Sequence, residues 1–460
     1  MKKTDLKSEA LFAEKSVWKA IFSLAIPSCI TILIMVFYNL ADMFFIGQLG
    51  STAQVAAVSI VGPVFSLAVA VATMLGIGGS SVIASTAGSG KLEDARALGS
   101  LCFYTGIALG LICTIVMLLG GEPLLKLLGA SEATKSYASE YLRMLALGAP
   151  MMILSTTLPA LLRSDGAIKE GLLGNLLGTM LNIILDPVFI FTLDLGVSGA
   201  AIATVIGNTV STIVYVTYII RKGQILGLNP LLAMKNIKLL WRVMAIGLPN
   251  GISSILSGFA SSFANNLLAS YSVNAVAAMA AAGKVSMIIS MLQMGICMGV
   301  APMLAYNYGA GKIARLQEII KKLSLLTVIV GTLSTLICIL GRGELIGLFL
   351  KESSARRLGE ELVVLLVLVS PLLGFYYLST NFLQATGKAM LATIVSLLRQ
   401  GIILMPALFL LERLLGVPGI GLAYPVADGL SVGAALILLL GQLATAKKRI
   451  EAYNRQEART

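Results

Sequence analysis

The chain has 460 residues, of which 57% are hydrophobic and 12% are charged, and its 34 Lys and Arg outnumber its 22 Asp and Glu. Soluble domains carry about 45–50% apolar and about 25% charged residues, so this composition excludes an ordinary water-soluble fold. The chain has no histidine, which excludes histidine proton relays, Ser-His-Asp catalysis and the common zinc sites. Its five cysteines lie in apolar segments without paired spacing and predict neither disulfides nor a metal site.

Long apolar segments predict twelve membrane-spanning helices, since about 20 such residues cross a bilayer. Cutting the apolar runs at their Gly, Pro and polar breaks places them at 18–46, 53–84, 99–121, 138–162, 170–192, 196–220, 243–270, 275–306, 322–349, 360–384, 388–412 and 417–445. The first run continues through Asp42 to Gly47 without a small-residue cleavage pattern, so we expect a helix rather than a signal peptide. The expected fold class is an all-α polytopic membrane protein.

The two halves of the chain repeat each other with an offset of about 221 residues. Pairs of matching segments mark the repeat: Ile26-Pro27 and Leu248-Pro249, Gly88-Ser89-Gly90-Lys91 and Gly309-Ala310-Gly311-Lys312, Leu195-Gly196-Val197 and Leu415-Gly416-Val417. Six spans in each half bring both halves in from the same side, which is a parallel repeat of two six-helix lobes. We expect an N-lobe at 1–220, a solvated amphipathic cytoplasmic connector at 221–242, a C-lobe at 243–446 and a cytoplasmic tail at 447–460.

Most of the 34 Lys and Arg residues fall in the loops on one side of the predicted spans. By the positive-inside rule, both termini are cytoplasmic and the chain is a multi-pass protein of the cell membrane. The basic residues are spread over many short loops, so we expect no nucleic-acid partner. Membrane lipids are the expected surroundings, with anionic-lipid contact by Lys447-Lys448-Arg449 as a further reading of the tail. We expect a monomer.

Two carboxylates stand out within the predicted spans, Asp42 and Asp186. An ionised side chain at this depth costs at least ~2.5–3.5 kcal/mol, which makes each a candidate functional residue. Helical spacing puts Asn39 beside Asp42 and Asn182 beside Asp186, and Thr204 reaches the same depth. Such a group of oxygens suits either proton exchange or a small hard cation such as Na⁺. The alternative is a set of satisfied polar residues that pins these helices together.

The residues around these positions resemble the MATE multidrug exporters, and the resemblance covers essentially the whole chain. It rests on Tyr38-Asn39-Leu40-Ala41-Asp42, Leu181-Asn182-Ile183-Ile184-Leu185-Asp186-Pro187, Gly199-Ala200-Ala201-Ile202-Ala203-Thr204, Ala305-Tyr306-Asn307-Tyr308 and Leu383-Gln384-Ala385-Thr386-Gly387. The resemblance, closest to the DinF-like and MepA-like branch, implies two lobes in a V around a large cavity. It also implies export of organic cations, drugs or toxic metabolites, in exchange for H⁺ or Na⁺, without an organic cofactor.

Within that resemblance Asp42, Asn182, Asp186 and Thr204 fall on the cation-coupling positions, with Tyr38 and Asn39 as neighbours. No metal ion is implied beyond Na⁺. The segment 259–266 lacks the acidic residue that other branches carry in helix 7. The repeat replaces Asn182 and Asp186 by Ile403 and Ala407, so we expect ion coupling in the N-lobe alone.

Four other residues interrupt apolar spans. Pro27 and Pro249 each remove a helix hydrogen bond and predict a kink, which acts either as a hinge or as a static bend. Arg399 and Asp428 lie at similar depth in neighbouring predicted spans, and we expect a structural ion pair. The alternatives are that Arg399 faces the cavity and repels cationic cargo, or that Asp428 faces it and attracts cargo.

Two competing functions share some of these features. A lipid-linked sugar flippase of the same superfamily has the same helix duplication, but we expect a more cationic cavity for its pyrophosphate cargo. An intramembrane aspartyl enzyme also uses two membrane aspartates, but the chain has no Gly-x-Gly-Asp motif. The sequence therefore predicts a transporter and no enzyme.

Overall fold

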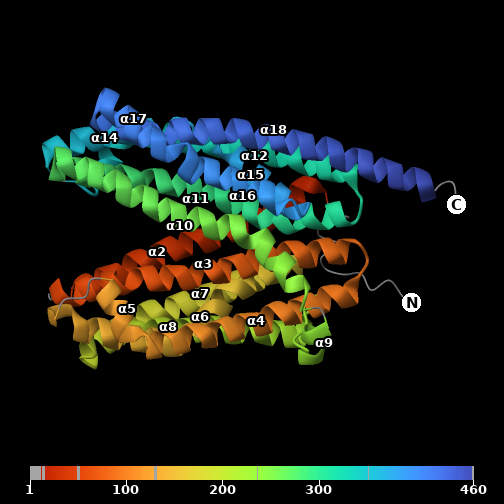
Figure 1. Cartoon of the computed structure of the whole chain (residues 1–460), viewed down its shortest axis with the longest axis horizontal. Helices are drawn as coiled ribbons and strands as arrows, with labels where there is room; N and C mark the ends of the chain where they lie inside the picture. Colours follow the sequence, from red (N-terminus) through yellow and green to blue (C-terminus); the bar gives the residue numbers. More distant parts are fainter. Residues whose placement is uncertain are drawn as a thin grey trace. The chain divides into compact units, whose positions relative to one another are not determined.

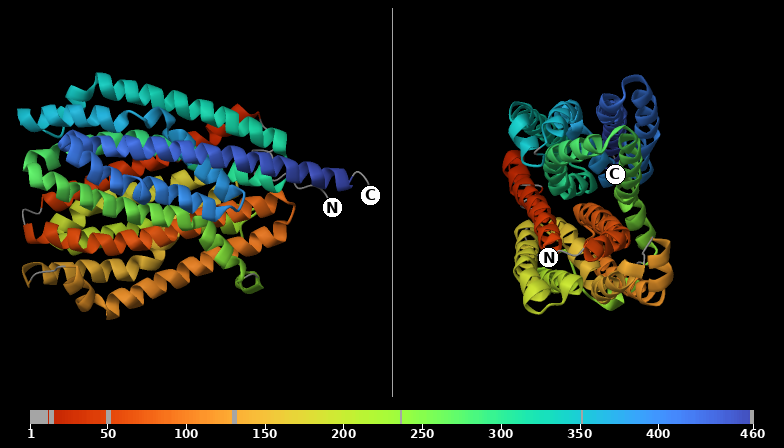
Figure 2. Two further views of the ribbon diagram at one scale, coloured as in Figure 1. Left: turned by 45° about the horizontal axis from the view of Figure 1, so that its top comes forward. Right: turned by 90° about the vertical axis from the view of Figure 1, so that its left-hand side faces the viewer.

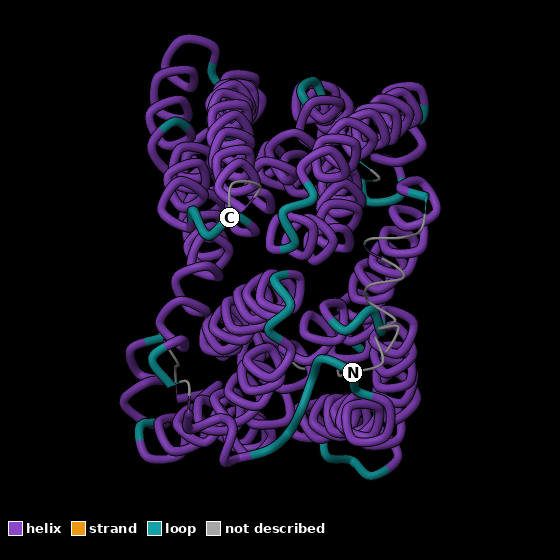
Figure 3. The backbone as a smooth tube through the Cα atoms, turned by 90° about the vertical axis from the view of Figure 1, so that its right-hand side faces the viewer, coloured by secondary structure: helices purple, strands orange, loops and turns teal. Residues whose placement is uncertain are grey.

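The computed structural model describes residue 12 and residues 16–48, 52–128, 132–235, 237–350 and 352–457. Every regular element among these residues is a helix, joined by short loops (Figures 1 and 3). Eleven described helices are long and apolar enough to cross a membrane, or twelve if one pair bent by 46° forms a single span. The all-α polytopic fold expected from the sequence is therefore confirmed.

The helices follow the predicted spans closely. In the first half they are α2 (Val17–Gly47), α3 (Thr52–Gly88), α4 (Leu92–Leu119), α5 (Gly121–Leu127), α6 (Glu132–Ser164), α7 (Ile168–Pro187), the π-helix η2 (Val188–Thr192), α8 (Gly196–Lys222) and α9 (Pro230–Lys235). In the second half they are α10 (Leu239–Tyr271), α11 (Val273–Gly309), α12 (Ile313–Leu340), α13 (Arg342–Gly347), α14 (Ser353–Val367), α15 (Ser370–Ala385), α16 (Ala389–Leu397), the π-helix η3 (Leu398–Ile402), α17 (Leu404–Leu415) and α18 (Val417–Glu457).

Three pairs of glycines related by the sequence repeat have the same backbone conformation. Gly90 and Gly311 have φ values of 80° and 68°, Gly166 and Gly387 of 73° and 74°, and Gly196 and Gly416 of 53° and 64°. This left-handed region strongly favours glycine, so each pair marks the same turn in both halves. The two halves thus share their turn geometry as well as their helix order.

The chain forms two compact units whose borders lie inside helices. Among the described residues, unit 1 comprises those between 30 and 247, and unit 2 comprises those between 12 and 29 and between 248 and 457. The sequence-based division instead places the border in the connector at 221–242. The first part of α2 thus belongs to unit 2 and the first part of α10 to unit 1, so each half contributes its leading half-helix to the other unit.

Matching glycines explain how these half-helices pack. A Cβ on Gly78 of α3 would lie 1.9 Å from the carbonyl oxygen of Val243 in α10. A Cβ on Gly299 of α11, the repeat mate of Gly78, would lie 2.7 Å from the carbonyl oxygen of Leu24 in α2. Because only glycine permits such close backbone approach, each unit holds the leading half-helix tightly.

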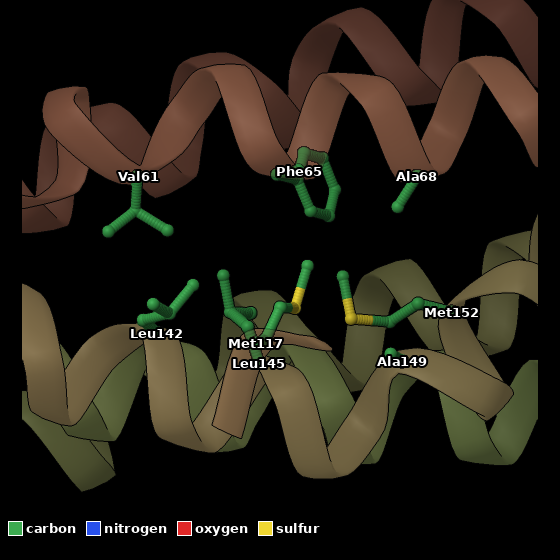
Figure 4. A pocket seen from close by; sticks show the side chains of 8 residues that line it. All are labelled: Val61, Phe65, Ala68, Met117, Leu142, Leu145, Ala149 and Met152. Atoms are coloured by element: carbon green, nitrogen blue, oxygen red, sulfur yellow. The ribbon is translucent and has the colours of Figure 1, made fainter. Parts of the chain in front are cut away.

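A small apolar cavity lies in the core of unit 1 (Figure 4). It has a volume of about 10 Å³, and α3, α4 and α6 contribute its lining side chains. Met117 and Met152 point into it beside Phe65 (Figure 4). These flexible methionines fill an irregular core gap and leave no room for cargo there.

The first part of the connector packs against unit 1, while its basic residues Arg221, Lys222, Lys238 and Arg242 are exposed. Ile225 and Leu226 are buried, and Asp165 accepts hydrogen bonds from the backbone N–H of Ile225 at 2.6 Å and of Gln224 at 3.2 Å. Tyr104 donates to the carbonyl oxygen of Leu228 at 3.0 Å. The helix that follows, α9, lies against α4 (Figures 1 and 2). Side chains of unit 1 therefore satisfy the backbone of this segment.

Candidate functional site

The site in unit 1 begins with glycines that let α7 and α8 touch. A Cβ on Gly178 would lie 2.0 Å from Ser211 Oγ and 2.4 Å from the carbonyl oxygen of Gly207. A Cβ on Gly207 would in turn lie 2.6 Å from the carbonyl oxygen of Gly178 and 3.0 Å from Asn182 Cβ. Small residues at a membrane helix crossing bring the two backbones together in this way.

Polar side chains of α8 bond to α7 along this crossing. Tyr215 donates to the carbonyl oxygen of Gly171 at 3.2 Å, and Ser211 donates to that of Gly174 at 2.9 Å. Farther along, Asn182 Nδ2 donates to Thr204 Oγ1 at 3.4 Å. The series of hydrogen bonds fixes the register of the two helices, so that Asn182 faces Thr204 inside the bundle.

Asp186 lies in α7 one helical turn beyond Asn182. Its exposure is 0%, and those of Asn182 and Thr204 are 2% and 6%. Asn182 Oδ1 is buried and has no hydrogen-bond partner among the described residues. Buried polar atoms normally have partners, so an amide oxygen without one, a helical turn from a carboxylate, is a candidate ligand for a small cation.

The end of α7 departs from regular helix just after Asp186. Pro187 closes α7, and the π-helix η2 follows at Val188–Thr192. A Cβ on Gly199 of α8 would lie 2.6 Å from the carbonyl oxygen of Phe189, so the start of α8 packs closely on this turn. π-bulges occur often at functional sites, and here one directly follows the buried carboxylate.

The second half of α2 is packed at the same end of unit 1. Phe45 packs against Ile190 and Ala200, which lie four residues after Asp186 and four residues before Thr204. Asp42 lies three residues before Phe45 in the same helix. The side chains of Tyr38, Asn39 and Asp42 lie outside the described part of the structure, so the predicted role of these three residues stays a prediction.

Unit 2 has no equivalent of this polar group at the repeat positions, which are Ile403 and the buried Ala407. It has an ion pair instead. Arg399 Nε lies 2.6 Å from Asp428 Oδ1, and the two side chains are 13% and 18% exposed. The structure thus brings together the two residues for which the sequence predicted a pair.

Aromatic rings complete the surroundings of Arg399. Its guanidinium carbon lies 4.7 Å from the ring centre of Tyr376 and 5.6 Å from that of Tyr377. Arg399 is part of the π-helix η3, whose repeat partner in α7 is regular helix. Asp428 and both rings limit the orientation of the guanidinium, as cation–π contacts and an ion pair do together.

The two predicted hinge prolines lie within helices. Pro27 is inside α2 and Pro249 inside α10, each within two residues of a unit border. Their position agrees with a bend at the place where each helix passes from one unit to the other. Hinge motion itself stays a prediction.

Sequence reasoning missed the residues that support the site. Asn208 Oδ1 accepts a hydrogen bond from Ser155 at 2.5 Å, and its Nδ2 donates to the carbonyl oxygen of Thr204 at 2.8 Å. The i, i+4 spacing of Thr204 and Asn208 was a usable signal, but the partner from α6 was not readable from spacing. The sequence also gives no sign that Gly178 and Gly207 lie at a helix crossing, because the two glycines belong to different helices and form no motif.

Comparison with known proteins identifies the family. The MatE family model matches residues 27–188 and 249–410, one copy in each half. The chain belongs to the MatE family. Its two copies are separated by the offset that the sequence repeat predicts.

Individual relatives agree with this assignment. The chain is similar to proteins named multidrug export protein MepA from Staphylococcus saprophyticus and Staphylococcus aureus, each 32% identical over 94% of this chain and 96% of the relative. It is also similar to the Vibrio cholerae MATE transporter VcmN in its bent form, with a TM-score of 0.87, 26% identity and coverage of 96% and 98%. The fold is also similar to that of an outward-facing multidrug resistance MATE transporter, with a TM-score of 0.90 and 23% identity. The match covers 97% of this chain and 100% of the other. This MatE-family chain is therefore a multi-pass membrane transporter rather than an enzyme.

Proposed function

We propose that this MatE-family chain is a secondary active antiporter that exports amphipathic organic cations, including drugs and toxic metabolites, in exchange for H⁺ or Na⁺. The relatives named multidrug export proteins support the class of cargo. The coupling ion binds in unit 1, at Asp42, Asn182, Asp186 and Thr204. Both termini are cytoplasmic, the protein works as a monomer in the cell membrane, and no organic cofactor takes part.

One observation carries the coupling site. Asp186 is fully buried next to the Asn182–Thr204 contact, and Asn182 Oδ1 has no partner within the described residues. A buried carboxylate in a membrane interior is costly when charged, so carboxylates at such positions are typical of sites that bind a proton or an ion. The same positions in unit 2 are apolar, which supports a coupling role confined to unit 1.

The chemistry of these groups permits two coupling ions. A proton neutralises one carboxylate directly, and carboxylate, amide and hydroxyl oxygens are also the ligands that a hard cation such as Na⁺ prefers. Either ion changes the net charge of the site by one. Loading and release of that charge would bias the two access states of the transporter by differential binding.

The decisive experiment uses purified protein in proteoliposomes with a fluorescent organic cation as cargo. Imposing a pH gradient and a Na⁺ gradient separately identifies the coupling ion, and Asp186→Asn should reduce gradient-driven transport at least tenfold. Asp94→Asn, a change of an exposed aspartate in the first turn of α4, is the matched control and should transport normally. Equal transport by Asp186→Asn and the control would refute coupling through this residue.

The same vesicles separate the competing function. A fluorescent lipid-linked sugar in place of the organic cation tests flippase activity. If the lipid-linked sugar is translocated and the fluorescent organic cation is not, the protein is a flippase and the proposed antiporter function is wrong.

A further inference from the structure

An aromatic and basic cluster lies on unit 2 at the start of α2. Trp18 stacks on Phe22 with ring centres 5.7 Å apart and planes 20° apart, and Lys322 of α12 places Nζ 5.8 Å from the Trp18 ring centre. An open recess lies over this cluster, lined by Ser16, Trp18, Lys19, Phe22 and Ser23. The recess has the basic Lys19 and an aromatic wall, Lys322 of a second helix lies over the Trp18 ring of that wall, and no part of the proposed transport site uses it.

Apolar stripes lead away from this recess along both helices. On α2, Phe22 and Ile26 are 44% and 53% exposed at a spacing of four residues. On α12, the residues after Lys322 form a second stripe: Leu325, Ile329 and Leu333 are 52%, 44% and 54% exposed. Exposed apolar stripes of this kind on membrane-spanning helices are suited to contact with lipid chains.

We propose that this recess is a binding site for an anionic phospholipid, with the phosphate between Lys19 and Lys322 and an acyl chain along the stripe of α2. Tryptophan and lysine both favour the boundary between headgroups and hydrocarbon, where an indole ring and a long lysine stem are half immersed. A soluble phosphate would use the lysines but not the apolar stripe. The continuity of charge and stripe therefore selects a lipid.

The charge balance of the recess favours an anion. Lys322 pairs with Glu318 of the same helix, whose side chain is 47% exposed. Lys19 is exposed and forms no ion pair among the described residues, so Lys19 and Lys322 together outweigh the single charge of Glu318. Since an exposed ion pair is weak, a lipid phosphate competes readily with Glu318 for the Lys322 ammonium.

The tryptophan content of the chain makes the site directly measurable. Trp18 and Trp241 are the two tryptophans, and Trp241 belongs to α10, where it is 81% exposed. In a Trp241→Phe background, Trp18 is the single fluorophore. Nanodiscs then carry a fixed fraction of phospholipid brominated near the headgroup end of one acyl chain, either phosphatidylglycerol or phosphatidylcholine, because bromine quenches only nearby indole.

The proposal predicts stronger Trp18 quenching by brominated phosphatidylglycerol than by brominated phosphatidylcholine, with an enrichment of roughly fivefold for each lysine that contacts the phosphate. Lys19→Gln combined with Lys322→Gln should make the two lipids quench equally. Lys321→Gln, which removes an adjacent exposed charge on the same helix, should preserve the difference. Tryptophan emission maximum and gel-filtration profile check that each variant is folded.

Two outcomes overturn the proposal. Equal quenching by both lipids in the Trp241→Phe protein means that the recess contacts lipid without selecting its charge. Loss of the phosphatidylglycerol preference on adding millimolar glycerol phosphate means that a soluble phosphate occupies the recess instead.

Discussion

At the residue scale, the proposed ion coupling depends on which carboxyl groups change charge. Asp42 and Asp186 are carried by two different helices of unit 1, and Phe45 packs the helix that carries Asp42 against the α7–α8 end of the unit. A carboxylate that binds and releases an ion must be ionisable, whereas a carboxylate that only pins helices need not be. Replacement by the neutral isostere separates these roles.

Asp42→Asn should abolish gradient-driven export while expression and folding are retained. The amide keeps the size and hydrogen-bonding capacity of the side chain but removes its titration. Drug resistance of cells, together with the amount of protein in the membrane, measures the effect. Full resistance at normal protein level would exclude Asp42 from coupling.

Arg399 and Asp428 should behave as a mutually dependent pair. Arg399→Ala or Asp428→Ala alone leaves the other charge largely buried and should cost about 3–5 kcal/mol of stability, whereas the double variant should recover much of the loss. Thermal unfolding in detergent, analysed as a double-mutant cycle, measures the coupling. The exposed pair Arg357–Glu361, at 3.8 Å and with side chains 86% and 59% exposed, is the control and should show almost no coupling. Additive losses at Arg399 and Asp428 would rule out a structural pair.

Asp165 should hold the connector on unit 1. Burial raises the pKa of its carboxyl, and the hydrogen bonds from the N–H groups of Ile225 and Gln224 oppose that shift. Asp165→Ala leaves those buried donors without their acceptor, at a cost of about 1–3 kcal/mol. Limited trypsin cleavage after the exposed Lys222 should become about tenfold faster, because cleavage follows local opening. Asp94→Ala should be cleaved like the unchanged protein, and no acceleration in Asp165→Ala would contradict the anchoring role.

At the element scale, the crossing of α7 and α8 sets the site. Gly178→Ala should separate these helices, because the new methyl group would meet Ser211 Oγ and the carbonyl oxygen of Gly207. We expect about 1–3 kcal/mol of destabilisation, the usual cost of overpacking, and a large loss of transport in vesicles. Gly258→Ala in α10 is the matched control, since a Cβ there meets no atom within 4 Å. A stable Gly178→Ala protein with normal transport would show that the close approach is not required.

Several elements differ from the predicted spans for identifiable reasons. The helices α4 and α12 begin at Leu92 and Ile313, ahead of the predicted starts at 99 and 322, because their first turns are charged and extend beyond the apolar part. The span predicted at 322–349 ends earlier, at Leu340, and the short helix α13 follows. The tenth predicted span is bent by 46° between α14 and α15. Hydropathy measures the length of an apolar segment. Breaks and bends inside such a segment leave its hydropathy unchanged, so hydropathy does not predict them.

At the scale of the whole molecule, the repeat governs topology. If both halves enter the membrane from the same side, Lys91 and its repeat mate Lys312 lie on the cytoplasmic side, and Asp194 and Arg413 lie on the other. All four residues are exposed. The test uses single cysteines at these positions in a background without the native cysteines, and a membrane-impermeant maleimide applied to intact cells. The two positions on each side of the membrane should then give the same result. Only Asp194→Cys and Arg413→Cys should be labelled, and labelling of Lys91→Cys or Lys312→Cys would contradict the topology.

The sequence by itself determined the membrane class, the repeat and the identity of the polar residues within the spans. These properties depend on composition and on spacing along one helix, as in Asn182 and Asp186 or the paired glycines at 90 and 311. Tertiary structure alone decided the exchange of leading half-helices between the units, the closeness of Asn182 to Thr204 and the burial of Ile225 and Leu226 in the connector. Each of these arises where backbones from distant segments meet at a glycine or satisfy a buried polar group, and hydropathy contains no information about which surfaces meet.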